Sequence, residues 1–132
     1  MKKERRTARE IALKILYQME MGSDPMEALR EYLAENRTIR ETREYAEYII
    51  KGVSENLDEI DNAIKKSTKK NFSLLLPIEK TILRIAAFEI LNGIKPAIAI
   101  DEAVELAKRY GEANSYRLIN GILDSLHKEN AS

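Results

Sequence analysis

The chain has 132 residues, of which 44% are hydrophobic, and its 22 basic and 22 acidic side chains leave no net charge. This length supports one hydrophobic core, so we expect a single domain over residues 1–132. No apolar run of about eighteen residues occurs, which argues against a membrane span, and no apolar segment lies near the basic N-terminus as in a secretory signal. A cytoplasmic protein is expected. The neutral charge also argues against indiscriminate coating of nucleic acid, so any such contact should be a local patch.

Cysteine is absent, and the one histidine, His127, lies near the C-terminus. These facts exclude disulfides, a cysteine nucleophile and cysteine-based zinc sites. The sequence also lacks a glycine-rich phosphate loop and a nucleophile elbow. One segment is rich in acidic residues: Glu55, Asp58, Glu59 and Asp61. Paired carboxylates can hold a metal, but a solvated helix face explains them more simply. We therefore expect no catalytic residue, no metal site and no cofactor.

The first half of the chain shows helical patterns. Apolar residues spaced by three and four predict a first helix over about 4–21, which ends at Gly22. A second, shorter helix is expected from Pro25 to about residue 36. The strongest periodic signal runs over residues 39–66 and predicts one long third helix.

The second half continues in the same way. Segment 71–77 breaks the pattern and fits either a packed connector or one short helix. Residues 78–91 are apolar on nearly all sides, which is typical of a central helix surrounded by others. Two further helices are expected, over about 96–110 and from residue 114 or 115 onward. The sequence contains no β-hairpin signal and predicts an all-α fold of six or seven helices.

The charge is plainly unbalanced at the N-terminus. Residues 1–9 hold one acidic residue, Glu4, and five cations: Lys2, Lys3, Arg5, Arg6 and Arg9. Cations at the start of a helix face the positive end of its dipole, which costs about 0.3 to 1 kcal/mol each, so folding gives little reason to place them there. Tyr17 could extend this basic face with a ring for base stacking. Two explanations of these cations are possible on this evidence: an anion-binding surface, or a solvated tail that aids solubility.

Three stretches, taken together, carry a family resemblance. The first is Arg5-Arg6-Thr7-Ala8-Arg9-Glu10 with Ala12 and Leu16-Tyr17, and the second is Ile78-Glu79-Lys80 with Leu83-Arg84-Ile85-Ala86 and Glu89-Ile90. The third is residues 99–108, followed by Tyr110-Gly111, Ser115 and residues 120–124. In this order and spacing, over nearly the whole chain, they resemble the NusB family of bacterial transcription antitermination factors. The resemblance implies two three-helix bundles packed into one domain.

The resemblance also implies a function. NusB proteins bind the single-stranded boxA element of nascent ribosomal RNA transcripts together with NusE, a small-subunit ribosomal protein, and help RNA polymerase read through terminators. The implied partners are therefore boxA RNA, NusE and the RNA polymerase antitermination complex, with no membrane. A homodimer is also plausible for such a protein.

By position, the resemblance places RNA-binding residues in two regions. The first holds the arginine-rich motif Arg5, Arg6 and Arg9, with Tyr17 further along the same face; Lys2 and Lys3 are added to it because of their charge. The second, at the start of the last helix, holds Asn114, Arg117 and Leu118. The family often has phenylalanine where Leu118 stands, so this protein either lacks that stacking ring or uses Tyr116 in its place. Glu79 matches a position at the contact with NusE, although a carboxylate favoured at a helix start explains it equally well.

Two alternatives come from other classes of protein. A helical protein-interaction module or homodimer would use the arginines against an acidic protein surface, without sequence-specific RNA binding. An RNA-modifying enzyme is the second, because a NusB-like domain begins some ribosomal RNA cytosine methyltransferases. The chain ends at Ser132 without the second domain that such an enzyme needs, which disfavours this alternative.

Overall fold

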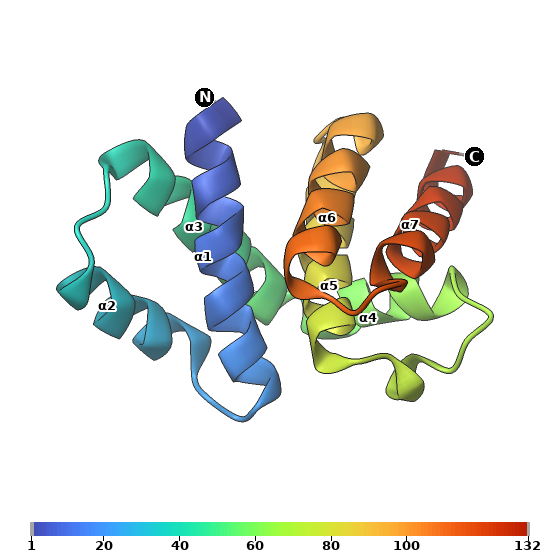
Figure 1. The fold of residues 1–132 in the computed structure, drawn as a ribbon, viewed down its shortest axis with the longest axis horizontal. Coiled ribbons are helices and arrows are strands. Elements are labelled where there is room, and N and C mark those ends of the chain that lie inside the picture. The colour runs from blue at the N-terminus through green and yellow to red at the C-terminus, as the bar shows by residue number, and fades with distance from the viewer. Residues whose placement is uncertain (1, 132) are drawn as a thin grey trace. The chain divides into compact units, whose positions relative to one another are not determined.

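A computed structural model describes residues 2–131 and confirms the all-α fold (Figure 1). These residues form seven α-helices and one short 3-10 helix, and no strand occurs among them. The chain divides between Glu55 and Asn56 into two compact units, and each is described by itself. That the whole chain forms one domain stays a prediction.

The first unit contains α1 (Lys2–Glu20), α2 (Pro25–Glu35) and α3 (Arg40–Glu55). Gly22 has a φ of 104°, a conformation that favours glycine, and lets the chain turn after α1. The Asp24 carboxylate then accepts a hydrogen bond from the Glu27 backbone N–H at 3.2 Å and caps α2. The α1 and α3 helices pack together through apolar stripes. The buried residues are Ala8, Ile11, Ala12, Ile15 and Leu16 on α1 and Ala46, Ile49, Ile50 and Val53 on α3.

The prediction of one long helix over residues 39–66 is wrong. The helix ends at Glu55, and α4 (Leu57–Lys66) starts after Asn56, whose φ and ψ of −123° and 29° are not helical. The Asn56 carbonyl accepts the first hydrogen bond of α4, from the Ile60 N–H at 3.0 Å. A break of one residue leaves the spacing of the apolar residues almost unchanged, so the periodicity of the sequence does not reveal where the helix is interrupted.

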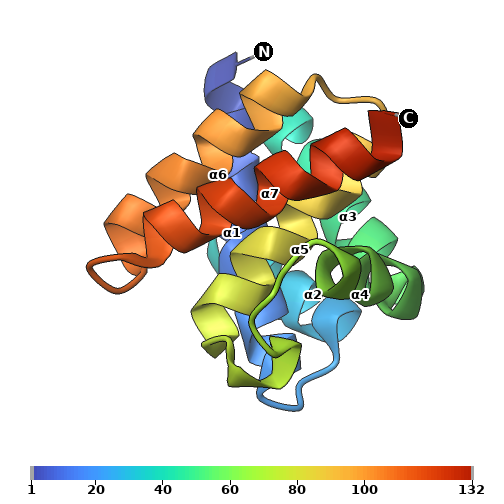
Figure 2. The same cartoon turned by 90° about the vertical axis from the view of Figure 1, so that its right-hand side faces the viewer.

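The second unit contains α4, the 3-10 helix η1 (Phe72–Leu74), α5 (Pro77–Leu91), α6 (Pro96–Tyr110) and α7 (Ser115–Ala131). Every residue from Thr81 to Glu89 is buried, and α5 packs against α4, α6 and α7, which confirms the predicted central helix. Figure 2 shows α6 and α7 running side by side over α5.

A partly buried ion pair joins α4 to the central helix. Arg84 donates from Nε to Asp61 Oδ1 at 2.8 Å and from Nη2 to Asp61 Oδ2 at 3.0 Å. The sequence suggested that Asp61 lies on a solvated acidic helix face. The ion pair with Arg84 shows that this interpretation is wrong for Asp61. Among residues 2–131, no three acidic or histidine side chains are grouped so that they could hold a metal ion.

Candidate nucleic-acid interface

The basic start of α1 divides into exposed and buried cations. Lys2, Lys3, Arg5 and Arg6 are all exposed. Arg9 is only 3% exposed, and its guanidinium lies 5.7 Å from the centroid of the Tyr45 ring on α3. Arg9 therefore differs from Arg5 in burial: the Arg9 side chain is enclosed by the first unit, whereas the Arg5 side chain is exposed to solvent. Direct phosphate binding by Arg9 stays a prediction.

Two tyrosines of α3 border this basic surface. The guanidinium of Arg5 lies 4.6 Å from the Tyr45 ring centroid, within the range of a cation–π contact. The rings of Tyr45 and Tyr48 are tilted by 35° with centroids 5.8 Å apart, and Tyr48 is 47% exposed. Neither tyrosine is recognisable from the sequence as part of this surface. Their spacing of three residues places them on one face of a helix, but no sequence signal indicates that α1 packs beside that face.

Tyr17, as expected, is exposed at 39% on α1. It follows Arg5 by twelve positions, which corresponds to about 18 Å along the helix axis. The two side chains are therefore too far apart to contact the same phosphate. If both bind RNA, they contact different points along the strand.

The start of α7 forms a second basic and aromatic cluster. The Tyr116 hydroxyl accepts a hydrogen bond from Arg117 Nε at 3.1 Å, and Lys108 Nζ lies 5.2 Å from the Tyr116 ring centroid. The hydrogen bond from Arg117 lowers the pKa of Tyr116 below its usual value, and the positive charges of Arg117 and Lys108 act in the same direction. Asn114 is exposed and Leu118 is half-buried. The structure thus brings Tyr116 and Arg117 into direct contact.

Glu79 is held inside the second unit. It is 5% exposed, and its Oε1 accepts from the Leu76 backbone N–H at 2.9 Å, at the start of α5. Its Oε2 accepts from the Ser115 hydroxyl at 2.7 Å. Both carboxylate oxygens are thus used within the chain. This geometry favours the helix-start explanation of Glu79, and a direct contact with a partner protein stays a prediction.

The same serine organises the turn between α6 and α7. The Glu112 N–H donates to the Ser115 hydroxyl oxygen at 3.1 Å, so that Ser115 connects this turn to Glu79. A Cβ at Gly111 would lie 2.8 Å from the Ala107 carbonyl oxygen and 2.9 Å from the Ser115 Cβ, which leaves no space for a side chain. Glycine is therefore needed where the chain approaches the start of α7.

The fold and these surfaces define the class of protein: an all-α protein whose exposed cations and adjoining aromatic rings are typical of a nucleic-acid interface. The sequence model of the NusB family matches residues 6–128. The chain belongs to the NusB family.

Similar proteins agree with this assignment. The transcription antitermination protein NusB of Clostridium acetobutylicum is 38% identical over 126 residues, which cover 92% of this chain and 93% of that protein. The solved structure of T. maritima NusB is 38% identical with a TM-score of 0.87, over 95% of this chain and 91% of that one. A crystal structure of antitermination factors NusB and NusE with double-stranded RNA matches with a TM-score of 0.89 and 27% identity, over 98% of this chain and 99% of that one.

Proposed function

We propose that this chain is a bacterial transcription antitermination factor that binds the single-stranded boxA element of ribosomal RNA transcripts together with NusE. Through these contacts it joins the RNA polymerase antitermination complex and helps the polymerase read through terminators, in the cytoplasm. The observation that carries the proposal is the exposed basic start of α1 beside the Tyr45 ring, in a member of the NusB family. In residues 2–131, no helix is long and apolar enough to cross a membrane.

The first unit supplies both charge and stacking. Phosphate binding is assigned to the exposed cations at the start of α1, which are Lys2, Lys3, Arg5 and Arg6. Their positive charges oppose the helix dipole, so helix stability does not explain them. Tyr48 and Tyr17 offer exposed rings on which unpaired bases can stack. Three or four neutralised phosphates give a slope of log affinity against log salt of about −2 to −3 for a single strand.

Arg9 acts by positioning. Its buried guanidinium packs against the same ring that Arg5 contacts. Arg9 therefore holds the Tyr45 ring in place. Arg5, which contacts the same ring, is already ordered by it and loses less conformational freedom when it binds a phosphate. A side chain ordered before binding loses less entropy when RNA binds.

The second unit contributes a smaller RNA contact. Arg117 can bind a phosphate or stack on a base, and the Tyr116 ring takes the place of the phenylalanine that the family often has at the Leu118 position. We propose that Glu79 supports NusE binding indirectly, by fixing the starts of α5 and α7. NusE adds RNA contacts of its own and raises the affinity through effective concentration.

Fluorescence anisotropy with a labelled boxA RNA and a scrambled RNA, each with and without NusE, tests this function. We expect selective binding that NusE strengthens. An Arg5→Ala/Arg6→Ala variant should lose most of it, whereas the matched variant Arg30→Ala/Arg37→Ala, which removes two exposed arginines elsewhere in the first unit, should not. Equal weak binding of both RNAs, unaffected by NusE, would support the alternative of a protein-interaction module or homodimer.

A further inference from the structure

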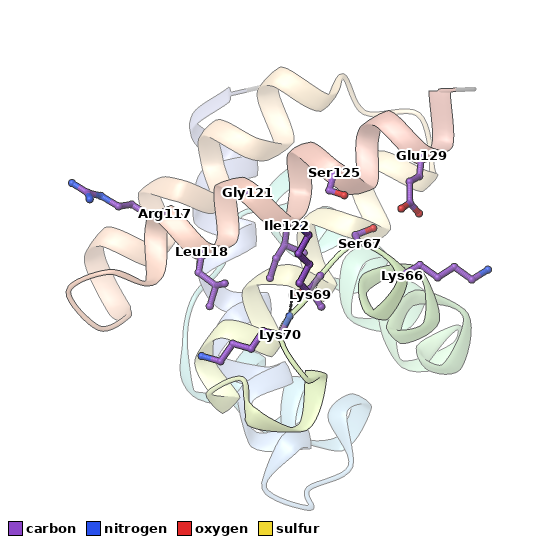
Figure 3. A pocket seen from close by; sticks show the side chains of 11 residues that line it. Lys66, Ser67, Lys69, Lys70, Arg117, Leu118, Gly121, Ile122, Ser125 and Glu129 are labelled. Carbon is purple, nitrogen blue, oxygen red and sulfur yellow. Dashed lines mark hydrogen bonds between the residues drawn. The ribbon is translucent and has the colours of Figure 1, made fainter.

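A basic groove crosses the second unit between α7 and the end of α4 with the loop that follows it (Figure 3). Its volume is about 660 Å³. Lys66, Lys69 and Lys70 lie along one side, and Arg117, Ile122 and Ser125 of α7 lie along the other. In Figure 3, Arg117 and Lys66 are at opposite ends, and Ser67, Ile122 and Ser125 lie between them.

The charge of this groove is mostly positive. Four cations line it against one acidic residue, Glu129. In the described part of the chain, no ion pair engages Lys66, Lys69 or Lys70. The helix dipole explains Lys66, which lies in the last turn of α4, but its effect falls off beyond that turn. Folding therefore gives no account of the charges at Lys69 and Lys70.

Local hydrogen bonds shape the loop that carries these lysines. The Ser67 hydroxyl donates to the Ala63 carbonyl oxygen at 2.8 Å and ends α4. The Lys70 N–H donates to the Thr68 hydroxyl oxygen at 3.1 Å. These bonds hold the backbone so that Lys69 and Lys70 are exposed at the groove. A charged loop that is ordered in the free protein loses less entropy when a ligand binds.

We propose that this groove binds a further stretch of the same single-stranded RNA, next to the nucleotides held at the start of α7. This inference rests on the proposed function. Arg117 and Leu118 belong both to the predicted RNA-binding region and to the groove lining, so a strand bound at one can continue into the other. The lysines bind its phosphates, as in the positively charged grooves of single-strand binding proteins, and the half-buried Leu118 offers apolar contact to a base.

The test compares two RNAs: boxA alone and boxA extended by about six nucleotides on either side, a length within the site sizes of single-strand binders. Wild type should bind the extended RNA about tenfold more tightly, with a salt slope steeper by about 1.4, as expected for two more phosphate contacts. Lys69→Ala/Lys70→Ala should bind both RNAs alike. Lys51→Ala/Lys95→Ala, which removes two exposed lysines outside the groove, should behave as wild type.

Ser125→Glu, which adds a negative charge to the groove and leaves every lysine in place, should repeat the loss for the extended RNA. If boxA binds selectively but Lys69→Ala/Lys70→Ala equals wild type on both RNAs, the groove proposal is wrong and the proposed function stands. If no RNA is bound selectively, the proposed function fails first. A loss of NusE binding with unchanged RNA binding would assign the groove to a protein partner and overturn our proposal.

Discussion

The Arg5 guanidinium lies 4.6 Å from the centroid of the Tyr45 ring and thereby couples the basic start of α1 to α3. A cation placed over an aromatic face keeps its charge and its hydrogen-bond donors while losing rotational freedom. In this position Arg5 can bind a phosphate with little further ordering. Tyr48, which packs beside Tyr45, extends the aromatic surface toward solvent.

Replacing the ring of Tyr45 should weaken RNA binding without any change of charge. Ordering one long side chain on binding costs about 0.5–1.5 kcal/mol, so we expect Tyr45→Ala, which frees Arg5, to lower the affinity for boxA RNA by about two- to tenfold. Tyr45→Phe keeps the ring and should bind nearly as wild type. Anisotropy titrations at one fixed salt concentration measure the difference. Equal weakening by both substitutions would show that the Tyr45 hydroxyl, and not the ring, is needed.

Arg9 and Arg5 should contribute differently to the free energy of unfolding. Arg9→Ala removes a buried side chain, and we expect it to lower the free energy of unfolding by about 1–2 kcal/mol, whereas Arg5→Ala, which removes one exposed cation–π contact, should lower it by no more than about 1 kcal/mol. Urea denaturation followed by circular dichroism gives both values. If Arg9→Ala is as stable as wild type but loses RNA affinity as strongly as Arg5→Ala, then Arg9 binds RNA directly.

The Glu79–Ser115 hydrogen bond should contribute to stability. Ser115→Ala removes the donor to a buried carboxylate oxygen, which should cost about 1–3 kcal/mol in the free energy of unfolding. Ser73→Ala, at an exposed serine of the same unit, is the control and should cost less. Urea unfolding measures both. An Ala substitution at Glu79 that kept full stability but abolished NusE binding would contradict our interpretation and restore a direct partner contact.

Tyr116 should titrate below the usual range of a tyrosine. Because Arg117 stabilises the phenolate, Arg117→Ala should raise the pKa of Tyr116 back toward its ordinary value. In the wild type, the pKa of Tyr116 is lower in the folded state than in the unfolded state. Between these two pKa values the folded state binds fewer protons, so Tyr116 makes the free energy of unfolding rise with pH in that alkaline window. NMR titration of the ring measures the shift. RNA affinity should fall as the phenolate forms, and this fall should be absent in Tyr116→Phe.

Much of this protein could be derived from residue order alone. Helical periodicity depends on neighbours three and four positions apart, so the sequence indicated an all-α fold, the central helix at 78–91 and most helix ends. The excess of cations before residue 10 is likewise visible without a structure. The family resemblance, carried by motifs distributed along the chain, is confirmed by the comparisons.

Contacts between helices were decided only by tertiary structure. Arg9 shares a sequence motif with Arg5, yet packing beside α3 buries the first and leaves the second exposed. The contact between Arg5 and Tyr45 and the hydrogen bond between Glu79 and Ser115 join residues 40 and 36 positions apart. The periodicity of a sequence indicates which face of a helix is apolar, but not which other helix covers that face. The roles of these side chains depend on that contact between helices, which is why the sequence alone did not predict them.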